Sequence, residues 1–172
     1  MKTSIFHALA ALSMLAACAN ESRDNATRGD TIRPSTPLSG GDVIDASRIQ
    51  FAPFLNVQTS TMQRTPGGAF YRDLEVGSGA AVDSGMTVSI HYAGHLPNGT
   101  PFDANQAPSA PFSFIAGVGQ VIQGFDEAVD GMRVGGKRQI VIPPELGYGS
   151  QAVGPIPPNS VLVFVIEVVA AR

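Results

Sequence analysis

The residues of this 172-residue chain that could do chemistry are mostly aromatic and branched apolar side chains in segments bounded by loops. They are Tyr92, Phe102, Phe112, Phe114, Val121, Ile122, Phe125, Tyr148, Ile156 and Phe164. Such side chains can strip water from a ligand and hold an apolar ring, so their chemistry would be that of an apolar pocket. They could equally be core residues, because aromatic side chains supply much of the buried area of any domain. The residue types alone leave both interpretations open.

The patterns of other common sites are missing. Gly117 and Gly119 lack the third glycine of a dinucleotide-binding fingerprint, and we interpret them as a turn. His91 and His95 fall on a strand and its following loop, where their spacing does not favour shared metal ligation. No serine lies in a G-x-S-x-G motif. We therefore predict neither a metal site nor a cofactor.

Strand patterns that could position the aromatic residues begin at about residue 62. Phe70, Leu74 and Val76 alternate with polar residues, which predicts a half-buried antiparallel strand. The segment 161–169 is apolar on both faces apart from Glu167, which predicts a covered central strand. Further strands are predicted over residues 86–94, 112–114 and 138–142, with an Asn-Gly turn at 98–99.

One segment has the periodicity of a helix. The apolar residues at helical spacing are Ile122, Phe125, Val129 and Met132, which predicts a short helix over 123–130 that ends at Gly131. Asp126 and Glu127 fall in this helix, where negative charge near the start complements the helix dipole, and we favour this role over a catalytic carboxylate pair. The predicted fold class is α+β, a twisted antiparallel β-sheet of five or more strands half-wrapped around one short helix.

The first seventeen residues have the pattern of an export signal. Lys2 provides a positive start, and the apolar stretch 5–15 is too short to serve as a membrane-spanning anchor. The stretch leads to Cys18 through Leu-Ala-Ala, which resembles the bacterial lipobox, and Cys18 is the only cysteine. We therefore predict a lipoprotein signal peptide over 1–17 and a lipid anchor on Cys18. Ala19 resembles the default signal for the outer membrane; an ordinary signal peptide with an incidental cysteine is the alternative.

The segment 18–61 is rich in Ser, Thr, Asn, Asp, Gly and Pro, which predicts a flexible linker that carries the anchor. Within it, residues 46–57 form a local apolar exception, and the sequence leaves open whether they dock on the domain or stay disordered. The remaining segment, 62–172, is the predicted catalytic domain. The formal net charge of −3 lacks the basic surface typical of nucleic-acid binding, so no nucleic-acid partner is expected.

Six motifs in this domain resemble the successive signatures of the FKBP family, the tacrolimus-binding peptidyl-prolyl isomerases. They are Ile90-His91-Tyr92-Ala93-Gly94, Gly99-Thr100-Pro101-Phe102-Asp103, Gly119-Gln120-Val121-Ile122-Gln123-Gly124-Phe125, Gly131-Met132-Arg133-Val134-Gly135-Gly136-Lys137-Arg138, Ile142-Pro143-Pro144-Glu145-Leu146-Gly147-Tyr148-Gly149 and Ile156-Pro157-Pro158-Asn159. Six motifs in the family's order make a specific match. The family fold, an antiparallel sheet half-wrapped around a short helix, agrees with the fold predicted from the periodicity.

The resemblance implies a proline-binding pocket made by ten residues. They are Tyr92, Phe102, Asp103, Phe112, Val121, Ile122, Phe125, Tyr148, Ile156 and Phe164. Phe125 matches the pocket floor, where the best-known members carry Trp, and this chain has no Trp. Phe keeps an aromatic face but lacks the indole N–H, which affects substrate preference and drug affinity. The basic residue with which many members pair the Asp has no counterpart in 106–109, so we expect a different partner for Asp103.

The resemblance further implies a peptidyl-prolyl cis/trans isomerase that accelerates X–Pro isomerisation during the folding of envelope proteins. Its expected partners are unfolded or folding polypeptides that contain proline, tacrolimus-type macrolides, and the membrane through Cys18. We expect a monomer in the outer membrane that faces the periplasm. Two alternatives remain open: a non-catalytic proline-binding module and an assembly chaperone.

Overall fold

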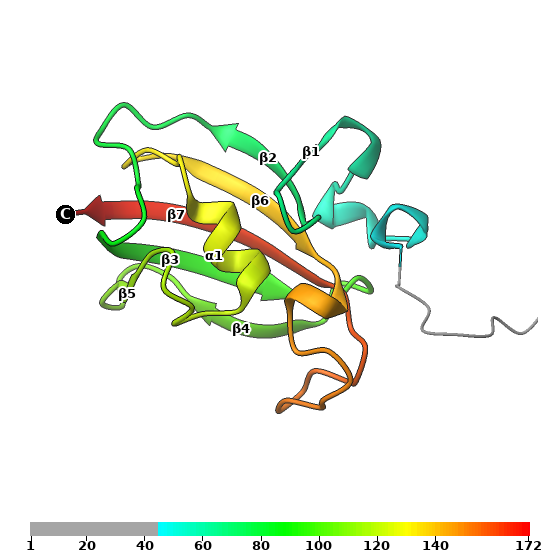
Figure 1. Ribbon diagram of the computed structural model, residues 1–172. Coiled ribbons are helices and arrows are strands. Elements are labelled where there is room, and N and C mark those ends of the chain that lie inside the picture. Colours follow the sequence, from blue (N-terminus) through cyan, green and yellow to red (C-terminus); the bar gives the residue numbers. More distant parts are fainter. Residues whose placement is uncertain (1–44) are drawn as a thin grey trace, which may run out of the picture. The chain divides into compact units, whose positions relative to one another are not determined.

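The structure, a computed structural model, describes residues 45–172, and these form a seven-stranded antiparallel sheet with one α-helix (Figure 1). The predicted signal peptide, Cys18 and linker residues up to 44 lie outside the described residues. The strands are β1 (Gln63–Arg64), β2 (Phe70–Glu75), β3 (Thr87–His95), β4 (Pro101–Asn105), β5 (Phe112–Ile115), β6 (Lys137–Ile142) and β7 (Leu162–Ala171), and the helix is α1 (Gln123–Val129). Four 3-10 helices cover Ala46–Arg48, Pro53–Leu55, Thr59–Thr61 and Pro144–Leu146. The predicted α+β fold class is confirmed.

The sheet order is β1-β2-β6-β7-β3-β4, and β5 pairs with the first half of β3 while β4 pairs with its second half. Strand β7 lies between β6 and β3, as its apolar residues on both faces predict. Two strands, β1 and β4, were not predicted. Strand β1 has only two residues, and β4 contains Pro, Asp and Asn, which are depleted in strands and tolerated at a sheet edge.

The burial predicted for the strand over 70–76 is wrong at two of three positions. The alternation over 70–76 predicts three buried residues, yet only Phe70 is buried, at 5% exposure; Leu74 is 45% and Val76 is 80% exposed. The register between β2 and β6 shifts between Asp73 and Glu75, and β2 ends at Glu75. This bulge interrupts the alternation on which the prediction depends, because it changes the face to which a side chain points.

Helix α1 crosses one face of the sheet, called the front face (Figure 1). Its Phe125, Ala128 and Val129 are buried in one core cluster with β6 and β7 side chains. The helix ends before Gly131, whose φ of 69° is readily adopted by glycine, as predicted. The Arg138 guanidinium donates to the carbonyls of Ala128 and Asp130 at 2.8 and 3.2 Å, which satisfies acceptors that the helix end leaves free.

The opposite face, called the back face, is covered in part by residues 46–62. Ala46 and Leu55 are buried in a second cluster with Phe70, Val141, Val161 and Val163 from the sheet. The buried Gln139 side chain donates to the Leu55 carbonyl at 2.7 Å, and the Ala52 N–H donates to the Pro97 carbonyl at 2.8 Å. The sequence left the docking of 46–57 open; the structure shows that this segment packs on the sheet.

Candidate active site

A cavity of about 520 Å³ opens between α1, the strands β3, β4, β5 and β7, and two loops. Eight of the ten predicted site residues line it. They are Tyr92, Asp103, Phe112, Val121, Ile122, Phe125, Tyr148 and Phe164. They come from segments far apart in the sequence, and the antiparallel pairings of β3 with β4, β5 and β7 bring four of these segments together. This cavity is the strongest candidate for a functional site.

The floor of the cavity is aromatic. The Phe125 ring meets the rings of Phe164, Phe114 and Tyr92 edge-to-face, with centroids 5.3, 6.0 and 6.2 Å apart. The edge of one ring carries partial positive charge and the face of the next carries partial negative charge, so these contacts hold the rings in defined orientations. Phe125 is 5% exposed, while Phe112 at the rim is 41% exposed. The rim therefore offers apolar surface that the protein itself does not cover.

Two predicted site residues, Phe102 and Ile156, are not among the residues that line the cavity. Phe102 packs edge-to-face on Phe164, with centroids 5.3 Å apart, and so supports a ring that does line it. Ile156 is 5% exposed in the front core cluster, within the loop that also carries Tyr148. The structure therefore places these two residues behind the pocket wall.

Gly94 on β3 makes this aromatic packing possible. A Cβ atom built there would lie 2.7 Å from the Phe102 ring and 2.8 Å from the Phe164 ring. Side-chain carbons do not approach this closely, so any other residue would displace one of the two rings. A glycine inside a strand indicates such a close approach, although the sequence does not show what approaches.

The polar end of the cavity is a hydrogen-bonded pair. The Tyr92 hydroxyl donates to Oδ2 of Asp103 at 2.8 Å. Burial, the hydrogen bond to Asp103 and the charge of that carboxylate raise the pKa of Tyr92 to about 12. Tyr92 therefore remains a hydrogen-bond donor at neutral pH. It is also the partner that Asp103 has in place of the basic residue expected in many relatives.

Two further donors lie at the cavity. The Ile122 N–H makes no hydrogen bond within residues 45–172, whereas the Ile122 carbonyl accepts from the first turn of α1. The Tyr148 hydroxyl likewise has no hydrogen-bond partner in that part of the chain. A ligand that brings two carbonyl groups could accept from both.

The resemblance did not assign roles to Gly119 and Gln120, which also line the cavity. The Gln120 side-chain oxygen accepts from the Ile115 N–H at 2.8 Å and so ties this loop to β5. A glutamine in a loop gives no sequence signal for such a contact. Within the described residues, no group of three His, Cys, Asp or Glu side chains is placed to hold a metal ion, and no helix is long and apolar enough to cross a membrane.

Comparison with known proteins gives a consistent result. Residues 79–169 match the family model described as FKBP-type peptidyl-prolyl cis-trans isomerase. The FK506-binding protein of Neisseria meningitidis is 45% identical over 102 residues, which cover 59% of this chain and 94% of that protein. FK506-binding protein 3 of Candida albicans is 50% identical over 106 residues, which cover 62% of this chain. The match spans only 25% of that relative's length.

Two solved structures resemble the fold. AtFKBP13 has a TM-score of 0.60 at 39% identity, over 64% of this chain and 98% of that one. FkpA from Escherichia coli has a TM-score of 0.59 at 36% identity, over 70% of this chain and 55% of that one. Sequence and fold therefore lead to the same family.

Proposed function

This chain belongs to the family of FKBP-type peptidyl-prolyl cis-trans isomerases, and from that premise we propose that it accelerates X–Pro isomerisation in polypeptides that fold in the bacterial cell envelope. The domain is an enzyme of the isomerase class by family. The observation that carries the proposal is the aromatic cavity with its Tyr92–Asp103 pair and two unused donors.

The chemistry requires no nucleophile, metal or cofactor. Rotation about an X–Pro bond is opposed by amide resonance, with a barrier of roughly 18–20 kcal/mol, and no covalent bond breaks. The planar amide is more dipolar than the twisted transition state, so a site that removes water from the planar form lowers the barrier. The aromatic floor provides such an environment, because apolar rings replace the water around the amide.

In this proposal the residues divide into two groups. The proline ring lies against the apolar wall, and the side chains that hold it are Phe112, Val121, Ile122, Phe125 and Phe164. The Ile122 N–H and the Tyr148 hydroxyl bind the carbonyls on either side of the proline. Asp103 and Tyr92 line the path of the rotating carbonyl. The Asp103 carboxylate stabilises the carbonyl carbon of the twisted amide, while the bond from Tyr92 fixes its orientation.

The proposed location rests on the amino-terminal sequence. Lys2, the apolar stretch 5–15 and the single cysteine at 18 support a lipoprotein whose mature chain begins at Cys18 and is anchored in the outer membrane, facing the periplasm. The predicted linker, residues 18–61, would join this anchor to the domain. Such a linker gives a monomeric domain room to reach folding clients near the membrane.

The relatives named FK506-binding protein support a second ligand class, tacrolimus-type macrolides, which would occupy the same cavity. Phe125 in place of Trp removes one N–H donor from the floor. We expect a macrolide to inhibit the isomerase by competition. The apolar rim at Phe112 and Tyr148 would contact the macrolide ring.

The decisive experiment measures cis-to-trans exchange of a short peptide with one X–Pro bond by NMR exchange spectroscopy, with the full chain in detergent. We expect acceleration by the wild-type chain and a large loss in Asp103→Ala. A chain that binds the peptide without speeding exchange would instead be a proline-recognition module, and Phe125→Trp would be the first variant to test. Suppression of aggregation of a proline-free client, without isomerase activity, would indicate a chaperone.

A further inference from the structure

The loop between β5 and α1, residues 116–122, carries much of the pocket wall and packs on the front core through Ala116, Val121 and Ile122. Gly119, Gln120, Val121 and Ile122 line the proline cavity from this loop. Gly117 and Gly119 have φ values of 75° and 74°, in the region that favours glycine, and Val118 between them is 54% exposed. The exposed middle of the loop, residues 117–119, therefore needs contacts from other elements to hold one conformation.

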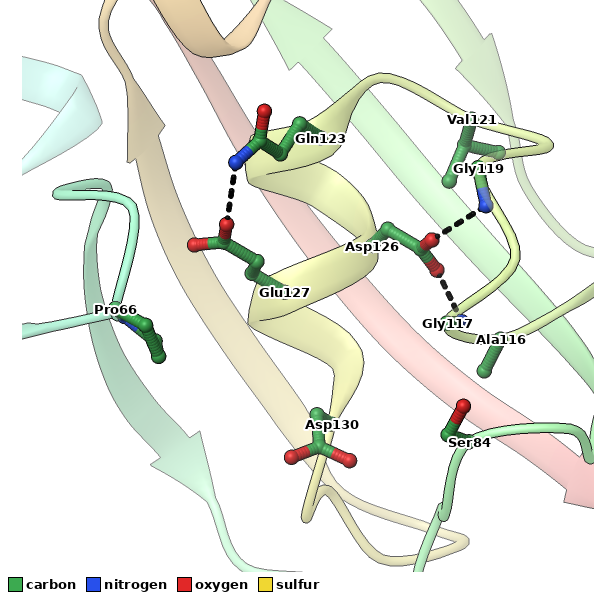
Figure 2. A pocket seen from close by; sticks show the side chains of 10 residues that line it. All are labelled: Pro66, Ser84, Ala116, Gly117, Gly119, Val121, Gln123, Asp126, Glu127 and Asp130. Atoms are coloured by element: carbon green, nitrogen blue, oxygen red, sulfur yellow. Dashed lines mark hydrogen bonds between the residues drawn. The ribbon is translucent and has the colours of Figure 1, made fainter.

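On its other side the loop borders a second cavity, of about 510 Å³, which shares Gly119 and Val121 with the proline pocket (Figure 2). At Gly119 the loop thus lies between two cavities. An exposed segment in this position can shift toward either cavity, because empty volume offers few opposing contacts. Small displacements of the loop would alter the pocket directly.

The Asp126 carboxylate connects α1 to the loop beside this second cavity. Oδ1 of Asp126 accepts from the Gly117 N–H at 2.7 Å, and Oδ2 accepts from the Gly119 N–H at 3.0 Å (Figure 2). Asp126 is only 9% exposed, and a carboxylate at such a site requires hydrogen bonds to compensate for lost hydration. Hydrogen bonds to a charged acceptor are also stronger than neutral ones. Both oxygens of Asp126 are therefore committed to the loop.

We propose that Asp126 is a positioning residue of the isomerase: it ties the 116–122 loop to α1 so that the Val121 side chain and the Ile122 N–H keep their places in the proline pocket. The sequence suggested only a favourable interaction with the helix dipole for this residue, and its partners show a more specific task. The catalytic part of this inference rests on the proposed isomerase function.

The neighbouring residue provides a matched control. Glu127 lies on the same helix and also accepts from a backbone N–H, that of Gly67 at 2.8 Å. Figure 2 shows Glu127 directed away from Asp126, toward the segment around Pro66. Neither Glu127 nor Gly67 lines the proline cavity. Glu127→Gln thus perturbs a comparable contact of α1 without touching the pocket loop.

The experiment compares Asp126→Asn and Glu127→Gln with the wild-type full chain in detergent, at a temperature where all three remain folded. In Asp126→Asn the amide nitrogen cannot accept, so one of the two loop N–H groups loses its partner. We expect kcat/KM for the X–Pro peptide to fall about tenfold or more, since small misplacements of binding groups are costly in catalysis. For Glu127→Gln we expect a change of no more than about twofold.

Two readouts separate positioning from a general loss of stability. At least one of the Gly117 and Gly119 backbone amides should lose hydrogen-exchange protection in Asp126→Asn, and both should keep it in Glu127→Gln. Peptide affinity, measured by chemical-shift titration, should weaken only in Asp126→Asn. The proposal is overturned if both amides stay protected, if kcat/KM stays near the wild-type value despite lost protection, or if Glu127→Gln loses as much activity.

The failure of the proposed function would look different. If the wild-type chain binds the peptide but does not speed its exchange, the isomerase proposal fails. The positioning role is then decided by the two glycine amide signals and by peptide affinity, which do not depend on catalysis.

Discussion

The two faces of the sheet bury apolar surface in different ways. On the front face, α1 covers the strands and leaves an aromatic cavity whose rim residues Phe112 and Tyr148 are 41% and 37% exposed. On the back face, residues 46–62 pack on Phe70, Val141 and neighbouring valines, all exposed by 5% or less. The same strands contribute side chains to both faces, because successive residues point to opposite sides.

This difference separates stability from function. Side chains on the back face contribute through burial alone, and a change there alters the free energy of unfolding. Exposed aromatic residues on the front face contribute little burial, but they remain free to contact a ligand. The comparison predicts that back-face variants lose stability and keep activity, whereas rim variants of the pocket lose activity and keep stability.

The largest expected effect comes from the back face. Deletion of 45–61 would expose Phe70, Val141 and the valines beside them, and should lower the free energy of unfolding by more than about 3 kcal/mol, since burial of one such side chain contributes ~1.5–3 kcal/mol. Urea unfolding would measure this. The milder variant Leu55→Ala should cost ~2–5 kcal/mol. Where it remains folded, its kcat/KM should match that of the wild type; a loss of activity there would remove the distinction between the faces.

A substitution at Gly94 should affect both stability and activity, because Phe164 beside it belongs to the core and also lines the pocket. Gly94→Ala places a methyl group against the Phe102 and Phe164 rings, and overpacking of this kind costs about 1–3 kcal/mol. Because Phe164 lines the pocket, isomerase activity should fall as well. Thermal unfolding and peptide exchange would measure the two effects. Unchanged thermal stability together with full activity in Gly94→Ala would contradict the steric argument.

Phe112 tests the rim by itself. Phe112→Ala should lower kcat/KM about tenfold, which corresponds to ~1.4 kcal/mol of lost transition-state binding. It should change the free energy of unfolding by about 1 kcal/mol or less, because the ring is 41% exposed and its aromatic contacts, with Phe114 and Tyr92, are at the rim.

Phe54→Ala is the matched control for the rim, since Phe54 is a 68% exposed aromatic residue of the back-face segment. It should leave isomerase activity at the wild-type level. Equal activity losses in Phe54→Ala and Phe112→Ala would show that the rim has no special part in binding.

The sequence predicted the elements with strong periodicity and missed features that depend on distant contacts. Helix α1 and the central strand β7 follow from repeats of apolar residues, which report burial directly. The exposed Leu74 and Val76 were wrongly predicted as buried, because a bulge cannot be detected from alternation. The docking of 46–57 depends on the uncovered back face, which the sequence does not reveal before the sheet is assembled.

The candidate site shows the same limit. The resemblance led to ten residues, and eight of them line one cavity. Positions in a family motif can be matched to this sequence even when the contacts of the residues are unknown. Asp126 was missed as a partner of Gly117 and Gly119, since a carboxylate near a helix start already has an adequate explanation in the helix dipole. Hydrogen bonds between a side chain and a loop backbone depend on three-dimensional geometry, and residue types do not determine it.

The smallest effect concerns the polar end of the pocket at high pH. The pKa of Tyr92 is raised from 10.0 to about 12 by burial and by Asp103, so the folded protein retains a proton that the unfolded chain loses first. The stabilising contribution of Tyr92 is therefore complete below pH 10 and is lost as the pH rises toward about 12. Tyr92→Phe, which cannot ionise, lacks this loss.

The difference in unfolding free energy between wild type and Tyr92→Phe should thus shrink between about pH 10 and about pH 12, as measured by urea unfolding. Tyr71→Phe, on β2 outside the cavity, controls for the removal of any tyrosine hydroxyl. A difference that stays constant over this range would mean that Tyr92 ionises as readily in the folded protein as in the unfolded chain. The front-face pocket would then be wetter than its aromatic floor indicates, and desolvation of the proline amide would lose its structural basis.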